Sequence, residues 1–92
     1  MAIVKKLVLD VLKPHQPNVL EFARTIASAS NKCRVRVTVL EVDENTETIQ
    51  VVVEGGSIDF EAIQSSISEL GGSLHSIDEV EVQGKGQDSQ GP

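Results

Sequence analysis

The sequence predicts an α+β fold whose elements follow one another in the order β-α-β-β-α-β. Three observations predict it: a valine-rich hairpin in the middle of the chain (Val37–Ser57), a capped helix on each side of that hairpin, and an alternating strand near each end. Such a chain packs as a four-stranded antiparallel sheet with both helices on one face, the ferredoxin-like arrangement. Right-handed crossovers then give the spatial strand order 4-1-3-2.

The central hairpin consists of two valine-rich runs joined by the turn-forming residues Asp43–Thr46. β-branched residues favour strands, and a cluster of turn formers between two such runs favours a hairpin. An odd number of loop residues would place the valines of both runs on one face of the sheet. We therefore expect residue 37 to pair with 53, residue 39 with 51, and residue 41 with 49.

The segments before the hairpin read as strand, helix and strand. Ile3–Leu12 alternates so that apolar side chains lie on both faces, as in a central strand. The helix breaker KPHQP follows. Asn18–Ala29 is then expected to be a helix, because Asn18 is a good N-cap and Glu21 completes a capping box. Arg34–Val42 is the predicted second strand.

A second helix follows the hairpin and its Gly55-Gly56 pair. Asp59 is its expected N-cap, and Gly71-Gly72 supplies the left-handed end that stops a helix. The residues between them have one apolar stripe at helical spacing. The stripe consists of Phe60, Ile63, Ile67 and Leu70.

The last strand is predicted over Ser73–Gln83. Its apolar residues include both odd- and even-numbered positions, so in a regular strand they would point to both faces. This indicates a bulge near Ser76–Asp78. Gly84–Pro92 (GKGQDSQGP) has no apolar residue that could anchor it, so we expect a disordered tail. The chain is thus predicted to hold one domain, residues 1–83, and a tail, residues 84–92.

Composition excludes several classes of function. The lone Cys33 excludes an internal disulfide and a CxxC metal or redox motif, and it fits a reducing cytoplasm. The apolar runs are too short for a membrane span, so we expect a cytoplasmic protein without a membrane partner. Nucleic acid is disfavoured, because sheets that bind RNA need aromatic side chains and a basic surface, whereas this chain has two Phe, no Tyr or Trp, and a net charge of −6.

The charges are distributed unevenly along the chain. Residues 1–36 contain seven of the eight Lys and Arg residues, whereas residues 37–84 contain eleven acids and no Lys or Arg. In the predicted sheet, Arg34 and Arg36 lie on one edge strand, and Glu79 and Glu81 lie on the other. The basic edge of one copy can therefore meet the acidic edge of the next, and such a head-to-tail contact closes into a ring when the rotation divides the circle.

The sheet face without helices supports the same expectation. It shows aliphatic side chains, and a contiguous exposed apolar area usually marks an interface. In the alternative, polar residues at the edges divide this area into scattered side chains. We expect the protein to associate with itself as a homo-oligomer. The interface candidates are Arg34, Arg36, Leu40, Val42, Val52, Glu79 and Glu81.

The end of the predicted sheet that contains the hairpin tip is rich in acids and has one nearby cation, Lys13. Oxygen ligands without basic partners form Ca²⁺ or Mg²⁺ sites, and imidazoles would admit a transition metal. The cofactor class that this pattern indicates is a divalent cation, calcium or magnesium. The alternative is a hydrated acidic turn with two surface histidines, because the spacing matches no dedicated metal-binding loop. The ligand candidates are Asp10, His15, Asp43, Glu44, Glu47 and His75.

Asp10 has further interpretations, because a carboxylate in a central strand needs a partner. It could accept a hydrogen bond from the Lys13–Gln16 turn, or it could bond to His75 on the neighbouring strand. The second arrangement is the basis of an alternative function, a small enzyme with an Asp10/His75 acid-base site. Catalysis also needs a nucleophile, and none is evident. The sequence therefore favours a binding or regulatory domain over an enzyme.

Two motifs resemble a known family. The strings LDVLKPH (residues 9–15) and HSIDEV (residues 75–80) are similar to those of the archaeal domain-of-unknown-function family 211, and the resemblance covers residues 1–83. It implies a ferredoxin-like fold, an archaeal cytoplasmic setting and homo-oligomeric, ring-like assembly. The family has no established activity, so it transfers no catalytic residue. The segment SNKCRVR (residues 30–36) departs from the Gly- and Val-rich junction associated with the family.

Overall fold

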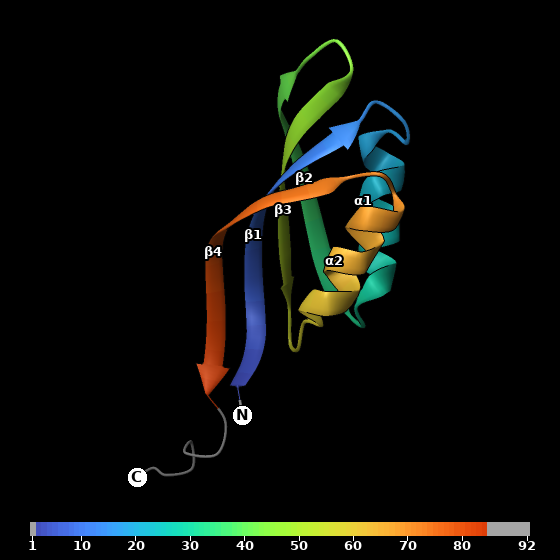
Figure 1. The fold of residues 1–92 in the computed structure, drawn as a ribbon. Helices are drawn as coiled ribbons and strands as arrows, with labels where there is room; N and C mark the ends of the chain where they lie inside the picture. The colour runs from blue at the N-terminus through green and yellow to red at the C-terminus, as the bar shows by residue number, and fades with distance from the viewer. Residues whose placement is uncertain (1, 85–92) are drawn as a thin grey trace, which may run out of the picture.

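The computed structural model describes residues 2–84 and contains the six predicted elements in the predicted order (Figure 1). The strand ends extend one or two residues beyond the predicted ones. The elements are β1 (Ala2–Pro14), α1 (Val19–Ala29), β2 (Cys33–Val42), β3 (Thr46–Gly55), α2 (Phe60–Glu69) and β4 (Ser73–Gly84). β4 thus includes Gly84, the first residue of the predicted tail, and residues 85–92 lie outside the described residues.

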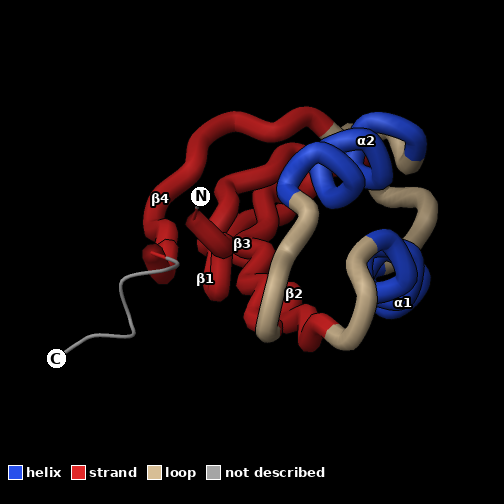
Figure 2. The backbone as a smooth tube through the Cα atoms, turned by 90° about the horizontal axis from the view of Figure 1, so that it is seen from below, coloured by secondary structure: helices blue, strands red, loops and turns tan. Residues whose placement is uncertain are grey.

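The four strands form one antiparallel sheet in the order β2-β3-β1-β4. This is the predicted order 4-1-3-2 read from the other edge, so the ferredoxin-like fold is confirmed. Both helices pack on one face of the sheet (Figure 2). The buried core between these two layers consists of Leu7, Leu9, Val11, Phe22, Ile26, Ile49, Val51, Val53, Ile58, Ile63 and Ile67. Neither helix in the described part of the chain is long and apolar enough to cross a membrane.

The two predicted N-caps are present, whereas within residues 2–84 the carboxylate of Glu21 bonds to Arg24 at 3.0 Å and not to the amide of Asn18 as a capping box requires. Asn18 Oδ1 accepts a hydrogen bond from the amide of Glu21 at 3.0 Å, and Asp59 Oδ1 caps α2 in the same way. α2 ends in a Schellman motif, in which the amide of Gly72 donates to the carbonyl of Ile67. This motif needs a left-handed residue after the helix, and Gly71 supplies it with φ +86°.

The register of the β2–β3 hairpin differs from the predicted one. Up to Val39, the β3 partner of each β2 residue lies two positions nearer the turn than predicted, so that Val37 lies opposite Val51 and not opposite Val53. The amide of Asp43 donates to the carbonyl of Thr46 at 2.8 Å, which makes a tight turn with an even number of residues. Such a turn would by itself place the valines of the two strands on opposite faces, and a bulge at Leu40 restores the common face. The predicted pairing was wrong because it assumed an uninterrupted ladder.

β4 bulges twice against β1. Asp78 has no partner on β1, which confirms the bulge predicted near Ser76–Asp78, and His75 is skipped as well. A third irregularity lies on β1 itself, at Lys5. A bulge turns the following side chains relative to the sheet. The two bulges therefore keep the apolar residues of β4 on the helix side although they do not share one parity in the sequence.

The open face of the sheet is less apolar than expected. Val8 and Val52 are each only 8% exposed, although they lie on this face. They form the middle of a cross-strand row that begins with Arg36 on β2 and ends with Glu79 on β4. Most of the exposed large apolar residues belong instead to the two edge strands. Those residues are Val39, Leu40 and Val42 on β2 and Ile77, Val80 and Val82 on β4.

We expect Leu9→Ala to lower the free energy of unfolding by about 2–5 kcal/mol, because Leu9 lies fully buried at the centre of the core and truncation leaves a cavity. Denaturant unfolding followed by circular dichroism measures this change. Leu20→Ala is the matched control, since Leu20 is 55% exposed on α1 and its loss should change stability by no more than about 0.5 kcal/mol. Equal effects of the two changes would contradict the core described here.

Candidate functional site

The structure divides the six predicted ligand residues into separate groups. His15, Glu47 and the backbone carbonyl of Glu44 form one cluster, and Asp10 and His75 form another. Asp43 lies at the hairpin tip with an exposed side chain. The predicted acidic end thus becomes two polar sites, one on each face of the sheet.

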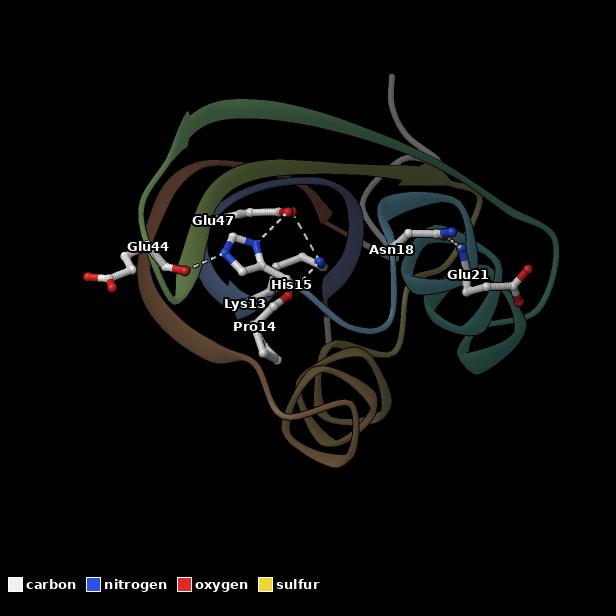
Figure 3. A network of polar contacts seen from close by, with 7 residues as sticks. All are labelled: Lys13, Pro14, His15, Asn18, Glu21, Glu44 and Glu47. Carbon is white, nitrogen blue, oxygen red and sulfur yellow. Dashed lines mark hydrogen bonds and ion pairs between the residues drawn. The ribbon is translucent and has the colours of Figure 1, made fainter.

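The first cluster joins the end of β1 to the β2–β3 hairpin (Figure 3). Lys13 Nζ donates to Glu47 Oε1 at 3.1 Å and to the carbonyl of Pro14 at 2.7 Å. His15 lies beside it, with Nδ1 3.0 Å from Glu47 Oε2 and Nε2 2.9 Å from the carbonyl oxygen of Glu44. One oxygen of Glu47 is therefore bonded to Lys13 at the end of β1, and the other to His15 in the loop that follows.

The environment of His15 favours its charged form. Both ring nitrogens face oxygen atoms that only accept hydrogen bonds, so the imidazolium, which donates from both nitrogens, satisfies both contacts. The hydrogen bond to Glu47 is the main cause that raises the pKa of His15, followed by the bond to the carbonyl of Glu44. The same bond with His15, followed by that with Lys13, lowers the pKa of Glu47. Both ring nitrogens of His15 are thus engaged within the described chain, one with Glu47 and one with the carbonyl of Glu44.

The geometry of residues 2–84 adds no support for the predicted cation site, which stays a prediction. Among residues 2–84, no three His, Cys, Asp or Glu side chains lie together so that they could hold a metal ion. Glu47 is hydrogen-bonded to both Lys13 and His15, and Glu44 contributes its backbone carbonyl to this cluster. The cation prediction counted Lys13 as the one cation near the acids, and the structure adds His15 beside Glu47.

Lys13 is the residue whose role the sequence interpretation missed. Its side chain is fully buried, and its Nζ lies 5.7 Å from the centroid of the Phe22 ring. The sequence does contain a signal for this role, because residues two apart on a strand face the same side of the sheet. Lys13 is two residues from the core residue Val11 on β1, and Glu47 is two residues from the core residue Ile49 on β3. The two side chains lie opposite each other in the register, so the sequence pattern could have placed this pair on the core side.

The second group lies on the open face. His75 Nδ1 is 3.1 Å from Asp10 Oδ2, which confirms the hydrogen bond between them and excludes the alternative in which Asp10 bonds to the Lys13–Gln16 turn. His75 reaches Asp10 because it occupies one of the bulges of β4. Beside the pair is a hollow of about 240 Å³. Its lining residues are Asp10, Val11, Leu12, Thr48 and His75.

Within residues 2–84, no nucleophile is hydrogen-bonded to the Asp10–His75 pair, although the hydroxyl-bearing Thr48 lines the same hollow. Within the described part of the chain, His75 makes no hydrogen bond to a hydroxyl or thiol, and the hydroxyl of Ser76 donates instead to Asp78 at 2.7 Å. The half-buried Cys33 bonds to the carbonyl of Ala27, on the helix side of the sheet. An acid-base pair without a nucleophile can bind and orient a polar group but does not form a covalent intermediate.

The end of the sheet away from the hairpin tip holds ion pairs between neighbouring strands. One cross-strand row on the open face alternates in sign from edge to edge: Arg34, Glu54, Lys6 and Glu81. Arg34 pairs with Glu54 at 3.2 Å, and Lys6 pairs with Glu79 at 3.2 Å. Among residues 2–84, Arg36 and Glu81 have no ion-pair partner, and they lie on opposite edges of the sheet.

Two comparisons with known proteins agree with the sequence motifs. Residues 5–87 match the model of the DUF211 family, described as "Uncharacterized ArCR". The chain is also 48% identical, over 82 residues, to an uncharacterized protein of Methanocaldococcus jannaschii; the aligned part covers 89% of this chain and 84% of that protein. The family match extends over nearly all of the described fold, and neither description names an activity, a ligand or a partner.

We expect His15→Gln to lower the thermal unfolding midpoint of the protein most between about pH 4.5 and pH 6.5. These are the ordinary pKa values of Glu47 and His15. The raised pKa of His15 gives stability that is complete below its unfolded pKa and is lost as pH rises through its folded pKa. The lowered pKa of Glu47 gives stability that is complete above its unfolded pKa and is lost as pH falls through its folded pKa. The difference between wild type and variant should therefore shrink on both sides of this window.

Glu44→Gln is the matched control for this pH dependence. Glu44 contributes only its backbone carbonyl to the cluster, so loss of its side-chain charge should leave the pH dependence of the midpoint as in wild type. Differential scanning fluorimetry of the three proteins from pH 4 to pH 9 measures the effect. A wild-type pH profile in His15→Gln would show that His15 does not stabilise the hairpin through its charge.

Proposed function

The chain belongs to the DUF211 family, and we propose that it is a non-enzymatic binding domain that assembles with copies of itself, head to tail, through the two edges of its sheet. The observation that carries the proposal is the complementarity of β2 and β4. These strands are the two edges, and each exposes a row of unpaired backbone N–H and C=O groups to which another strand can add. The exposed charged and apolar side chains of one edge match those of the other.

The direction of the strands permits a continuous sheet. β1 is antiparallel to both β3 and β4, and β3 is antiparallel to β2, so β2 and β4 run in opposite directions. If the β2 of a second copy is added beside β4 with the helices on the same side, the new pair is antiparallel. This is the same type of pairing that joins every strand within the chain.

One register matches the charges on the open face. If Arg34 of one copy lies opposite Glu81 of the next, antiparallel pairing also brings Arg36 opposite Glu79. The alternation of sign across the sheet would then continue from one copy to the next. Arg36 and Glu81, which have no ion-pair partner within the described chain, would each gain one.

The same register matches the apolar side chains on the helix side. It brings Cys33 of one copy opposite Val82 of the next and Val35 opposite Val80. The bulge at Asp78 changes the face to which the following side chains of β4 point. A strand added on the outer edge of β4 must therefore also leave Asp78 unpaired. Val37 then faces Ile77, and the next apolar residues, Val39 and Leu74, follow past the bulge at His75.

This pairing accounts for the exposed apolar residues of β4. Ile77, Val80 and Val82 are each about half exposed on the helix side, where β4 extends beyond the helix layer of its own chain (Figure 2). Covering the exposed halves of these side chains contributes on the order of 1 kcal/mol each. An unprotected edge with such residues would favour uncontrolled association, and a closed ring leaves no free edge.

The enzyme alternative has weaker support. The Asp10–His75 hydrogen bond is the observation that favours it, and the pair lies beside a hollow. Within residues 2–84, His75 makes no hydrogen bond to a hydroxyl or thiol, which favours binding over covalent chemistry at this place. We therefore propose the Asp10–His75 hollow as the binding site of the domain.

We expect light scattering at tens of micromolar to give a mass of several subunits, and we expect Arg36→Glu to lower it. The substitution removes the contact with Glu79 and places two acids opposite each other, which should raise the dissociation constant of each contact about 10- to 100-fold. Because both edges belong to the same chain, the exchange Arg36→Glu with Glu79→Arg should restore much of the mass.

Arg24→Glu is the matched control, since it makes the same change of charge on the exposed surface of α1, away from both edges. The control should keep the wild-type mass. A strict monomer at this concentration would overturn the assembly, and a dimer insensitive to Arg36→Glu would replace it with a symmetric pairing of sheet faces.

A further inference from the structure

We propose that the hollow beside Asp10 and His75 binds a small organic cation, an ammonium group on a short aliphatic chain. The inference specifies the ligand of the binding role proposed above. Every residue that carries it belongs to one chain, so it does not depend on the assembly of copies.

The charge of the hollow comes from Asp10. This residue lies in the central strand β1, in the cross-strand row with Gln50 and Ser76, and its side chain is 25% exposed. Within residues 2–84 no Lys or Arg pairs with it, and only Oδ2 has a hydrogen-bond partner, the imidazole of His75. A partly buried carboxylate with one unoccupied oxygen favours a cationic donor that reaches it from the open face.

The position of His75 is unusual for a strand residue. It lies in a bulge, between the pairs that Leu74 and Ser76 make with β1, and only this interruption lets it turn toward Asp10. A carboxylate only accepts hydrogen bonds, so His75 Nδ1 donates to it and Nε2 is left as an acceptor in the neutral ring. With the ring neutral, the pair therefore offers two acceptors that have no partner among residues 2–84, Asp10 Oδ1 and His75 Nε2.

The remaining walls of the hollow fit an ammonium group with a short chain. Thr48 adds a hydroxyl that can accept a third hydrogen bond, and a primary ammonium has three donors. Leu12, which is 41% exposed, provides apolar surface for the aliphatic part. A volume of about 240 Å³ limits the ligand to a small molecule.

A metal ion and an anion fit this place less well. Calcium and magnesium take six or more oxygen ligands, whereas the hollow offers one carboxylate, one imidazole and one hydroxyl beside two aliphatic residues. An anion would be repelled by Asp10, because no Lys or Arg side chain lines the hollow to compensate for it.

The test is a titration of the full chain with n-butylammonium, followed by ¹H–¹⁵N correlation spectra. We expect saturable shifts confined to amides around Asp10–Leu12, Thr48 and His75, and no such shifts with butanol or butyrate at the same concentrations. Asp10→Asn should weaken binding at least about tenfold and His75→Gln severalfold, because a charge-assisted hydrogen bond contributes more than a neutral one.

Asp43→Asn is the matched control, since it removes the same charge from an exposed position at the hairpin tip. Equal weakening in Asp43→Asn and Asp10→Asn, or no saturable shift in the folded wild type, would overturn the site. So would Ca²⁺ or Zn²⁺ shifting the same amides at lower concentration than butylammonium, since the hollow would then be a metal site. If Asp10→Asn fails to fold, Thr48→Val, which should weaken binding, takes its place.

The edge variant Arg36→Glu separates this proposal from the proposed assembly. Its binding of butylammonium should equal that of wild type even where its mass falls. Loss of binding in the folded Arg36→Glu variant would overturn a site contained in one chain. A wild-type protein that is monomeric and still binds would leave this site supported and overturn only the assembly.

Discussion

The ion pair between Lys13 and Glu47 fixes the register on which the rest of the structure depends. Lys13 is fully buried at the end of the core, and an unpaired ammonium there would cost several kcal/mol. A slip of one residue between β1 and β3 would turn Lys13 to the open face and Asp10 into the core, and a slip of two would place Lys13 opposite Ile49 or the turn. The pair thus contributes more to selecting one register between β1 and β3 than to the free energy of unfolding.

That alignment places the other features. With β1 and β3 in register, the even-numbered residues of β1 that follow the bulge at Lys5 face away from the helices. Lys6, Val8 and Asp10 therefore lie in successive rows of the open face. The first row then alternates in charge from one edge to the other, and the third presents Asp10 to β4. The bulges of β4 complete the arrangement, because they bring His75 to Asp10 while Ile77, Val80 and Val82 stay on the helix side.

The two histidines show how neighbours decide the chemistry of one residue type. His15 is held between a carboxylate and a carbonyl oxygen, both of which accept, so it is favoured as a cation and closes the hairpin against the loop after β1. His75 has one carboxylate partner and a ring nitrogen left over, beside a hollow. The first is a structural group, and the second is available to a ligand.

The sequence by itself determined the element order, the sheet order and both helix caps, because these depend on local alternation, on cap residues such as Asn18 and Asp59, and on the handedness of crossovers. It also indicated the Asp10–His75 contact and the oppositely charged edges. Only the tertiary structure decided the hairpin register, since the bulge at Leu40 offsets a change of turn length without leaving a mark in the pattern. It also decided that Val8 and Val52 are nearly buried and that Glu47 bonds to both Lys13 and His15. The reason is the same in these cases: the partner of a polar group or of an exposed face lies on another strand, and its identity depends on the register.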